Sequence, residues 1–220
     1  MRARRPTIVL CVLGAALGTG VVAWAAPLTT SPAQLMAFTV VGPVPITTCT
    51  LAPNADTYAD GAAPLTAQGT ATTLHVRTQL LLNKRTFVRF DVASCSIPAV
   101  ARLKTGSFNL VITTAPASSR TYDVHAVTAA WTEAALTWLA QPATAATATA
   151  SVATGTTGGV TLATDVMADV SAYVTGAATN NGWRVKDRTE DGVTAVETQF
   201  GSRENATVSQ RPSLVVTYYP

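Results

Sequence analysis

Histidine and charged residues are scarce in this chain of 220 residues. Only two histidines occur, His75 and His125, and charged residues make up 12% of the sequence. Two isolated histidines do not supply the closely spaced ligands of a zinc site, so we predict none. The chain is rich in Ala, Thr and Val and has few straight-chain helix formers such as Glu and Lys. This balance favours strands and turns and makes an all-β fold the first expectation.

The sequence also lacks the familiar catalytic motifs. It contains no G-x-S-x-G, no H-E-x-x-H and no phosphate-binding loop. Glu133 has no second acid paired with it at glycosidase distance, so we expect it to bind a backbone amide or an arginine. Tyr122 and His125 are residue types that a β-sandwich lyase uses, but their three-residue spacing puts them on opposite faces of a strand. We therefore predict that the protein is not an enzyme.

The N-terminus has the pattern of a secretory signal peptide. Three arginines in the first five residues precede the uncharged stretch Thr7 to Ala26, and Ala23-Trp24-Ala25 offers a small-x-small cleavage site. We predict a signal peptide over residues 1–25, followed by a Pro-rich lead-in over residues 26–48. The alternative is a retained signal anchor, because twenty uncharged residues are long enough to span a bilayer.

The chain without its three N-terminal arginines has no net charge. The sequence has 15 basic and 12 acidic residues, and removing the three N-terminal arginines leaves 12 of each. A neutral domain has no electrostatic footprint for duplex nucleic acid, so that class of partner is excluded. Any basic patch on the domain must be local.

Cysteine is also rare. Of the three cysteines, Cys11 lies within the predicted signal, which leaves Cys49 and Cys95. An even pair in an exported protein predicts a disulfide, and the alternative is two unpaired buried thiols.

Period-two hydrophobic segments recur from residue 49 to the C-terminus. In RTFVRFD, for example, Thr86, Val88 and Phe90 share one face of a strand, and turn residues separate this segment from the next. One helical stripe follows Asp165, which can cap its start, and Gly176 can close its end. The pattern predicts a jelly-roll-like β-sandwich of antiparallel strands with one short helix, over residues 49–220.

Seven stretches in order carry a family resemblance: ADTYADG, GTATTLHVR, RTFVRFDV, WTEAALTWLAQP, DVMADVSAYVTG, FGSRE and RPSLVVTYY. In their order and spacing the chain resembles the DNRLRE-domain family. This family comprises extracellular β-sandwich modules that are grouped with carbohydrate-binding modules and related to disaggregatase-type repeats. The resemblance implies a jelly-roll-like sandwich that binds polysaccharide, sometimes an acidic one.

Sugar recognition uses flat aromatic rings and planar hydrogen-bonding groups, which Trp and Arg supply best. The most concentrated basic segment is WRVKDR, residues 183–188, where strand alternation puts its three cations on one face. FGSRE adds an arginine able to bind a sugar carboxylate through two parallel hydrogen bonds. The predicted ligand-binding residues are Trp138, Trp183, Arg184, Lys186, Arg188 and Arg203.

These residues have structural alternatives that stay open at this point. Trp131, Trp138 and Trp183 can fill the interior, and the basic face can simply keep the surface soluble. Alternation predicts that Arg203 and Glu204 point to opposite faces and pair with different neighbours. No spacing matches a known calcium loop, so we predict no cofactor and no metal site. A structural calcium remains an alternative at the loop acids Asp56, Asp60, Asp187, Glu190 and Asp191.

The leading hypothesis is a secreted, noncatalytic carbohydrate-binding module that recognises an extracellular polysaccharide or cell-wall glycan, including acidic ones. One alternative is a structural or adhesive cell-surface or matrix protein without a specific glycan, and another is a polysaccharide lyase or hydrolase. Contact with a membrane is expected only if the N-terminal segment is retained as an anchor.

Overall fold

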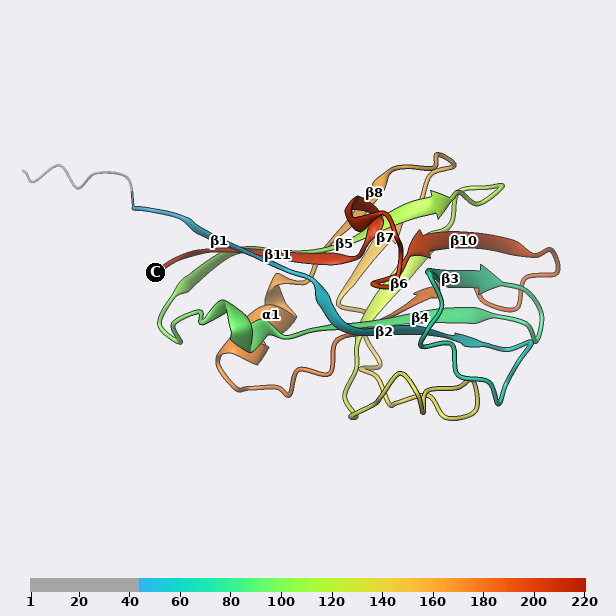
Figure 1. Ribbon diagram of the computed structural model, residues 1–220, viewed down its shortest axis with the longest axis horizontal. Coiled ribbons are helices and arrows are strands. Elements are labelled where there is room, and N and C mark those ends of the chain that lie inside the picture. The colour runs from blue at the N-terminus through green and yellow to red at the C-terminus, as the bar shows by residue number, and fades with distance from the viewer. Residues whose placement is uncertain (1–43) are drawn as a thin grey trace, which may run out of the picture. The chain divides into compact units, whose positions relative to one another are not determined.

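The computed structural model describes residues 44–220, and these form an all-β domain with one short α-helix (Figure 1). The predicted signal peptide and most of the predicted lead-in lie outside the described residues. Among residues 44–220, no helix is long and apolar enough to cross a membrane. The strands are β1 (Thr47–Leu51), β2 (Pro53–Asp60), β3 (Thr73–Thr78), β4 (Lys84–Phe90), β5 (Arg102–Thr114), β6 (Thr121–Ala126), β7 (Ala150–Ala153), β8 (Thr161–Asp165), β9 (Trp183–Asp187), β10 (Val196–Gly201) and β11 (Ser213–Tyr219), and the helix is α1 (Met167–Val174).

Every strand pairing is antiparallel, and the long strand β5 joins the two halves of the sheet. Residues 102–109 of β5 pair with β11, which in turn pairs with β1, while residues 112–114 pair with β10. β8 lies on the other edge of β5. The opposite layer has the order β2-β4-β9-β6-β7, and Figure 1 shows β2 and β4 apart from the β1-β11-β5 layer. The predicted sandwich of antiparallel strands is confirmed.

The main core lies between the two layers. It takes alternate residues from each strand, such as Phe108 and Leu110 of β5 and Val88 and Phe90 of β4, all of which are buried. This is the period-two pattern that the sequence predicted, because neighbouring residues on a strand point to opposite faces. Tyr122 crosses the interior, and its hydroxyl donates a hydrogen bond to Thr198.

A smaller apolar cluster lies on the outer face of the β2-β4 pair. Ala55, Ala59 and Phe87 point outward there and are covered by the segment that follows β6, through Trp131 and Leu136. The Trp131 indole donates a hydrogen bond to the carbonyl oxygen of Asn181. Trp131 therefore anchors the covering segment to the sheet, as the structural alternative for this residue expected.

The disulfide and the helix also agree with the sequence. Cys49 and Cys95 are bonded, with their Cα atoms 5.9 Å apart. The N-cap residue of α1 is Val166 rather than the predicted Asp165, although the backbone amide of Met167 donates to the Asp165 carboxylate. Gly176 follows the helix with a φ of +74°, a left-handed conformation that suits glycine.

Candidate functional site

The outer face of the β4-β9-β6 layer gathers most of the predicted basic residues. On β9, Trp183, Val185 and Asp187 are buried, while Arg184 and Lys186 are only partly buried and face outward. Arg184 lies opposite Phe87 of β4 and His125 of β6, and Lys186 lies opposite Asp123 of β6. The predicted alternation along this strand is therefore confirmed. We call Arg85, Asp123, Arg184, Lys186, Arg188 and Glu190 the basic face.

Two acids neutralise part of the basic face. Both oxygens of Glu190 accept hydrogen bonds of 2.7 Å from Arg85, and Lys186 lies 3.9 Å from the same carboxylate. Arg188 donates to Asp123, and its side chain is 52% exposed. Four cations against two carboxylates leave this face with two positive charges. The face therefore attracts anions.

Arg184 is the one cation of the basic face whose guanidinium has no hydrogen bond or ion pair within residues 44–220. Its Nε is buried and unpartnered. Burial lowers the pKa of Arg184, and the nearby charge of Arg85 lowers it further. An incoming oxygen acceptor would therefore meet the terminal nitrogens of this guanidinium, which have no hydrogen bond within the described chain and are not among its buried atoms.

Trp138 lies at the edge of the basic face and is half-buried. The Arg85 guanidinium stacks over its ring at 4.6 Å from the ring centroid. Arg85 also donates to the side chain of Gln141, three residues further along the same covering segment. Trp138 thus has an apolar ring beside the cations and is only partly buried. Its place among the ligand-binding residues stays a prediction.

The prediction that Trp183 contacts ligand is corrected. Its side chain is 0% exposed and packs in the main core against Phe90, Phe108 and Tyr173. Its indole nitrogen donates a 2.7 Å hydrogen bond to Asp169 of α1. Alternation correctly placed Trp183 opposite the cations, and that face turns out to be the inside of the sandwich. A ring buried there cannot stack on a sugar.

Arg203 belongs to a different place, beside the free edge of β2. Its guanidinium donates to Glu133 at 2.7 Å, and its Nε lies 2.8 Å from Glu204. The expectation that Arg203 and Glu204 point apart was wrong, because β10 ends at Gly201 and the turn that follows has no strand alternation. Glu133 also accepts a hydrogen bond from the backbone amide of Asp56, so the structural role expected for it is confirmed.

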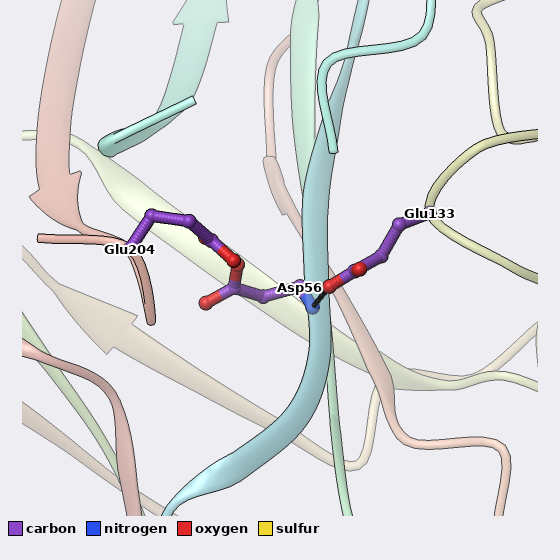
Figure 2. A group of neighbouring side chains, drawn as sticks. All are labelled: Asp56, Glu133 and Glu204. Carbon is purple, nitrogen blue, oxygen red and sulfur yellow. Dashed lines mark hydrogen bonds between the residues drawn. The ribbon is translucent and has the colours of Figure 1, made fainter. Parts of the chain in front are cut away.

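Asp56, Glu133 and Glu204 form a carboxylate cluster around β2. Figure 2 shows Glu133 and Glu204 approaching the strand from opposite sides, with the Asp56 carboxyl group turned toward Glu204. Oxygen atoms of all three lie within 4.8 Å of one another. Burial raises the pKa of Asp56 to about 7, and the charges of Glu204 and Glu133 add to this effect although the Arg203 amide opposes it. From the sequence, Asp56 was among the loop acids considered for calcium. No local pattern indicated that Glu133 and Glu204 would lie beside it.

The other four acids that the sequence suggested for calcium have protein partners, and two of them, Asp60 and Asp187, end strands rather than lie in loops. Asp187 is fully buried and receives two 2.8 Å hydrogen bonds from Arg120. Glu190 is bound by Arg85, as above, and Asp191 accepts a hydrogen bond from the Asn83 side chain. Asp60 accepts from the amide of Ala62. Of the five acids proposed for calcium, only Asp56 retains a buried oxygen without a partner in the described chain.

Tyr122 and His125 do not share a site. Tyr122 points into the main core, whereas His125 lies on the outer face opposite Arg184 and contacts the carbonyl oxygen of Ala145 at 3.0 Å. Burial lowers the pKa of His125, and Arg184 and Lys186 lower it further, so the imidazole is neutral near pH 7. The opposite orientation expected from their spacing is confirmed.

A separate hollow of about 520 Å³ is lined mainly by residues 89–97, around Cys95, and by Tyr173 and Val174 of α1, with Asn54 and Asn180. Its polar groups mostly bind one another or the backbone: Arg89 donates to Asn54, and Asn180 donates to the carbonyl oxygen of Phe90. The hollow therefore offers fewer free groups for an anionic ligand than the basic face does.

The comparisons with known proteins now fit this geometry. The model of carbohydrate-binding module family 96 matches residues 47–218, which cover more than half of the chain and run from the first residue of β1 to the last but one residue of β11. No curated protein matches the sequence. The chain therefore belongs to carbohydrate-binding module family 96.

Proposed function

We propose that the protein is a secreted, noncatalytic module that binds an acidic extracellular polysaccharide on the basic face. The family supports carbohydrate binding, and modules of this kind are typically noncatalytic. The more specific resemblance to the DNRLRE-domain family stays a prediction. The disulfide and the predicted signal peptide support export, because disulfides persist in oxidising compartments.

The observation that carries the proposal is the unpaired guanidinium of Arg184 among other cations. Uronate and sulfate groups are planar or compact anions that accept two hydrogen bonds from one arginine. Arg184 lies on the central strand of this layer, between β4 and β6, so a polymer running across the strands would pass over it. Lys186 and the exposed Arg188 extend the same positive strip toward the end of β9.

The Trp138 ring contributes the apolar part of a sugar site. Pyranose C–H groups pack against aromatic rings. The Arg85 guanidinium covers one face of this ring, so a sugar would contact the part of the ring that stays exposed. Binding through both kinds of group would distinguish a sugar acid from a simple anion. An acidic polysaccharide is therefore the ligand class whose chemistry fits best.

Binding of the purified protein to neutral and acidic polysaccharides at low and high salt tests the proposal. We expect binding to uronate polymers that weakens as salt rises, because exposed charges are screened beyond about 10 Å at 0.1 M salt. Arg184→Ala should weaken binding by about 10- to 100-fold, the value of one hydrogen bond to a charged group. The double variant Lys186→Ala, Arg188→Ala should weaken it further.

The control variant is Lys104→Ala, which removes an exposed cation from β5 rather than from the basic face. It should bind as the wild type does. Salt-insensitive binding to neutral glycans would contradict the basic face and move the site to Trp138. No binding to any polysaccharide would favour the alternative of a structural or adhesive surface protein.

A further inference from the structure

The carboxylate cluster of Asp56, Glu133 and Glu204 joins three parts of the fold that are far apart in sequence. Asp56 lies on β2, Glu133 on the covering segment after β6, and Glu204 in the turn after β10. Figure 2 shows Glu133 on one side of β2, where it accepts a hydrogen bond from the Asp56 amide, and the carboxyl groups of Glu204 and Asp56 on the other side. The basic face is on other elements, so the proposed polysaccharide site does not use this cluster.

Two oxygen atoms of the cluster have no partner among the described residues. Asp56 is 1% exposed, and its Oδ1 is buried without a hydrogen bond, although its Oδ2 accepts from the amide of Arg203. Oε2 of Glu204 is likewise buried and unpartnered. In Figure 2 the carboxyl groups of these two residues face each other. Buried polar atoms are almost always satisfied, so two facing acceptors call for a proton shared between them or for a bound cation.

The charges of the carboxylate cluster also indicate a bound cation. When Asp56, whose pKa is raised to about 7, is ionised, the three carboxylates carry three negative charges. Arg203 is the cation that contacts them, through Glu133 and Glu204. Two negative charges remain in a partly buried place. Burying uncompensated charge is costly, and a divalent cation would balance the cluster completely.

We propose that Asp56, Glu133 and Glu204 bind one calcium ion. All available ligands are oxygen atoms, which hard cations prefer over the nitrogen and sulfur ligands that zinc takes. Two oxygen ligands on one calcium ion are at most about 5 Å apart, twice the usual Ca–O distance, and the cluster atoms lie within 4.8 Å. Water or backbone carbonyl oxygens would complete the six to eight ligands that calcium takes.

The ion would hold the covering segment and the turn after β10 against β2. The covering segment also carries Trp131, which anchors it to the sheet, and Trp138, which borders the basic face. Calcium would therefore stabilise the fold and keep Trp138 in place.

The test is titration of chelator-treated protein with calcium, with magnesium, and with sodium at matched ionic strength. Calorimetry measures binding in each titration, and thermal unfolding measures the change in stability. We expect one calcium ion bound per chain. At calcium 100-fold above its dissociation constant, the unfolding temperature should rise by about 5 to 10 °C. Magnesium should give a smaller rise, because it demands a tighter octahedral shell, and sodium should give none.

Asp56→Asn and Glu204→Gln should each abolish the calcium response, and the matched control Asp91→Asn, at an exposed acid outside the cluster, should keep it. The wild-type titration stands by itself if a cluster variant fails to fold. An unfolding temperature that does not respond to calcium or chelator would overturn the proposal. So would an equal response to magnesium, or a calcium response retained in both cluster variants.

Discussion

Replacing Cys49 and Cys95 together with alanine is expected to lower the free energy of unfolding by about 4 kcal/mol. The bond closes a loop with a sequence separation of 46 residues, and this value follows from the chain entropy that such a cross-link removes from the unfolded state. Chemical denaturation of the wild type and of the double variant, Cys49→Ala with Cys95→Ala, measures the difference.

The location of the bond explains why the effect should be large. Cys49 lies at the middle of β1, a five-residue strand that pairs with β11 at the end of the sheet order. Cys95 lies in a short helical turn after β4, so the disulfide connects the two layers. Reductant should destabilise the wild type by a similar amount and leave the double variant unchanged. A difference below about 1 kcal/mol would show that the noncovalent contacts hold β1 without the cross-link.

Replacing Trp183 with alanine is expected to have the second large effect and to lower the free energy of unfolding by about 3 to 5 kcal/mol. The substitution would empty the centre of the main core, where the indole stacks on Phe108 at a centroid distance of 5.7 Å. It would also leave Asp169 without the indole donor, although Thr149 still donates to the same carboxylate. Denaturant unfolding of Trp183→Ala and of the milder Trp183→Phe measures both losses.

Trp183→Phe also checks the correction made to the sequence prediction. Phenylalanine keeps an aromatic ring in the core, so this variant should cost less stability than alanine and should bind polysaccharide as the wild type does. If Trp183→Phe folded with wild-type stability but lost binding, the placement of this ring in the core rather than in the ligand site would be contradicted.

The sequence predicted the fold through patterns that act over a few residues. Alternation found the strands, because one face of each strand is buried in the core: Val88 and Phe90 face inward on β4, as expected. The helix after Asp165 was found because its stripe and its capping residues are local. The disulfide was predicted because Cys49 and Cys95 remain when Cys11 is assigned to the predicted signal peptide, and the structure confirms it.

Alternation alone did not say which face of β9 is the inside. The side with Trp183, Val185 and Asp187 contains both an aromatic ring and a charge, and Asp187 is buried because Arg120, on a distant loop, neutralises it. An ion pair across 67 residues leaves no trace in local sequence. For the same reason the importance of Arg85 on the basic face was missed, since its partner Glu190 is 105 residues away.

The carboxylate cluster was beyond sequence reasoning for a related cause. Asp56 and Glu133 are 77 residues apart and meet only because the covering segment folds back over β2. Arg203 and Glu204 are adjacent, but their pairing depends on β10 ending at Gly201. A shift of one or two residues in the end of a strand decides whether alternation applies to the residues there. These ends are the least predictable part of a strand.

The most direct test of the central claim is calorimetric titration of wild type and Arg184→Ala with one uronate polymer and with the same polymer after its carboxylates are reduced to alcohols. If the basic face binds sugar acids, the wild type should bind the native polymer about 10- to 100-fold more tightly than Arg184→Ala does, and both proteins should bind the reduced polymer equally weakly. Equal binding of the native and reduced polymers by the wild type would contradict recognition of an acidic polysaccharide by Arg184.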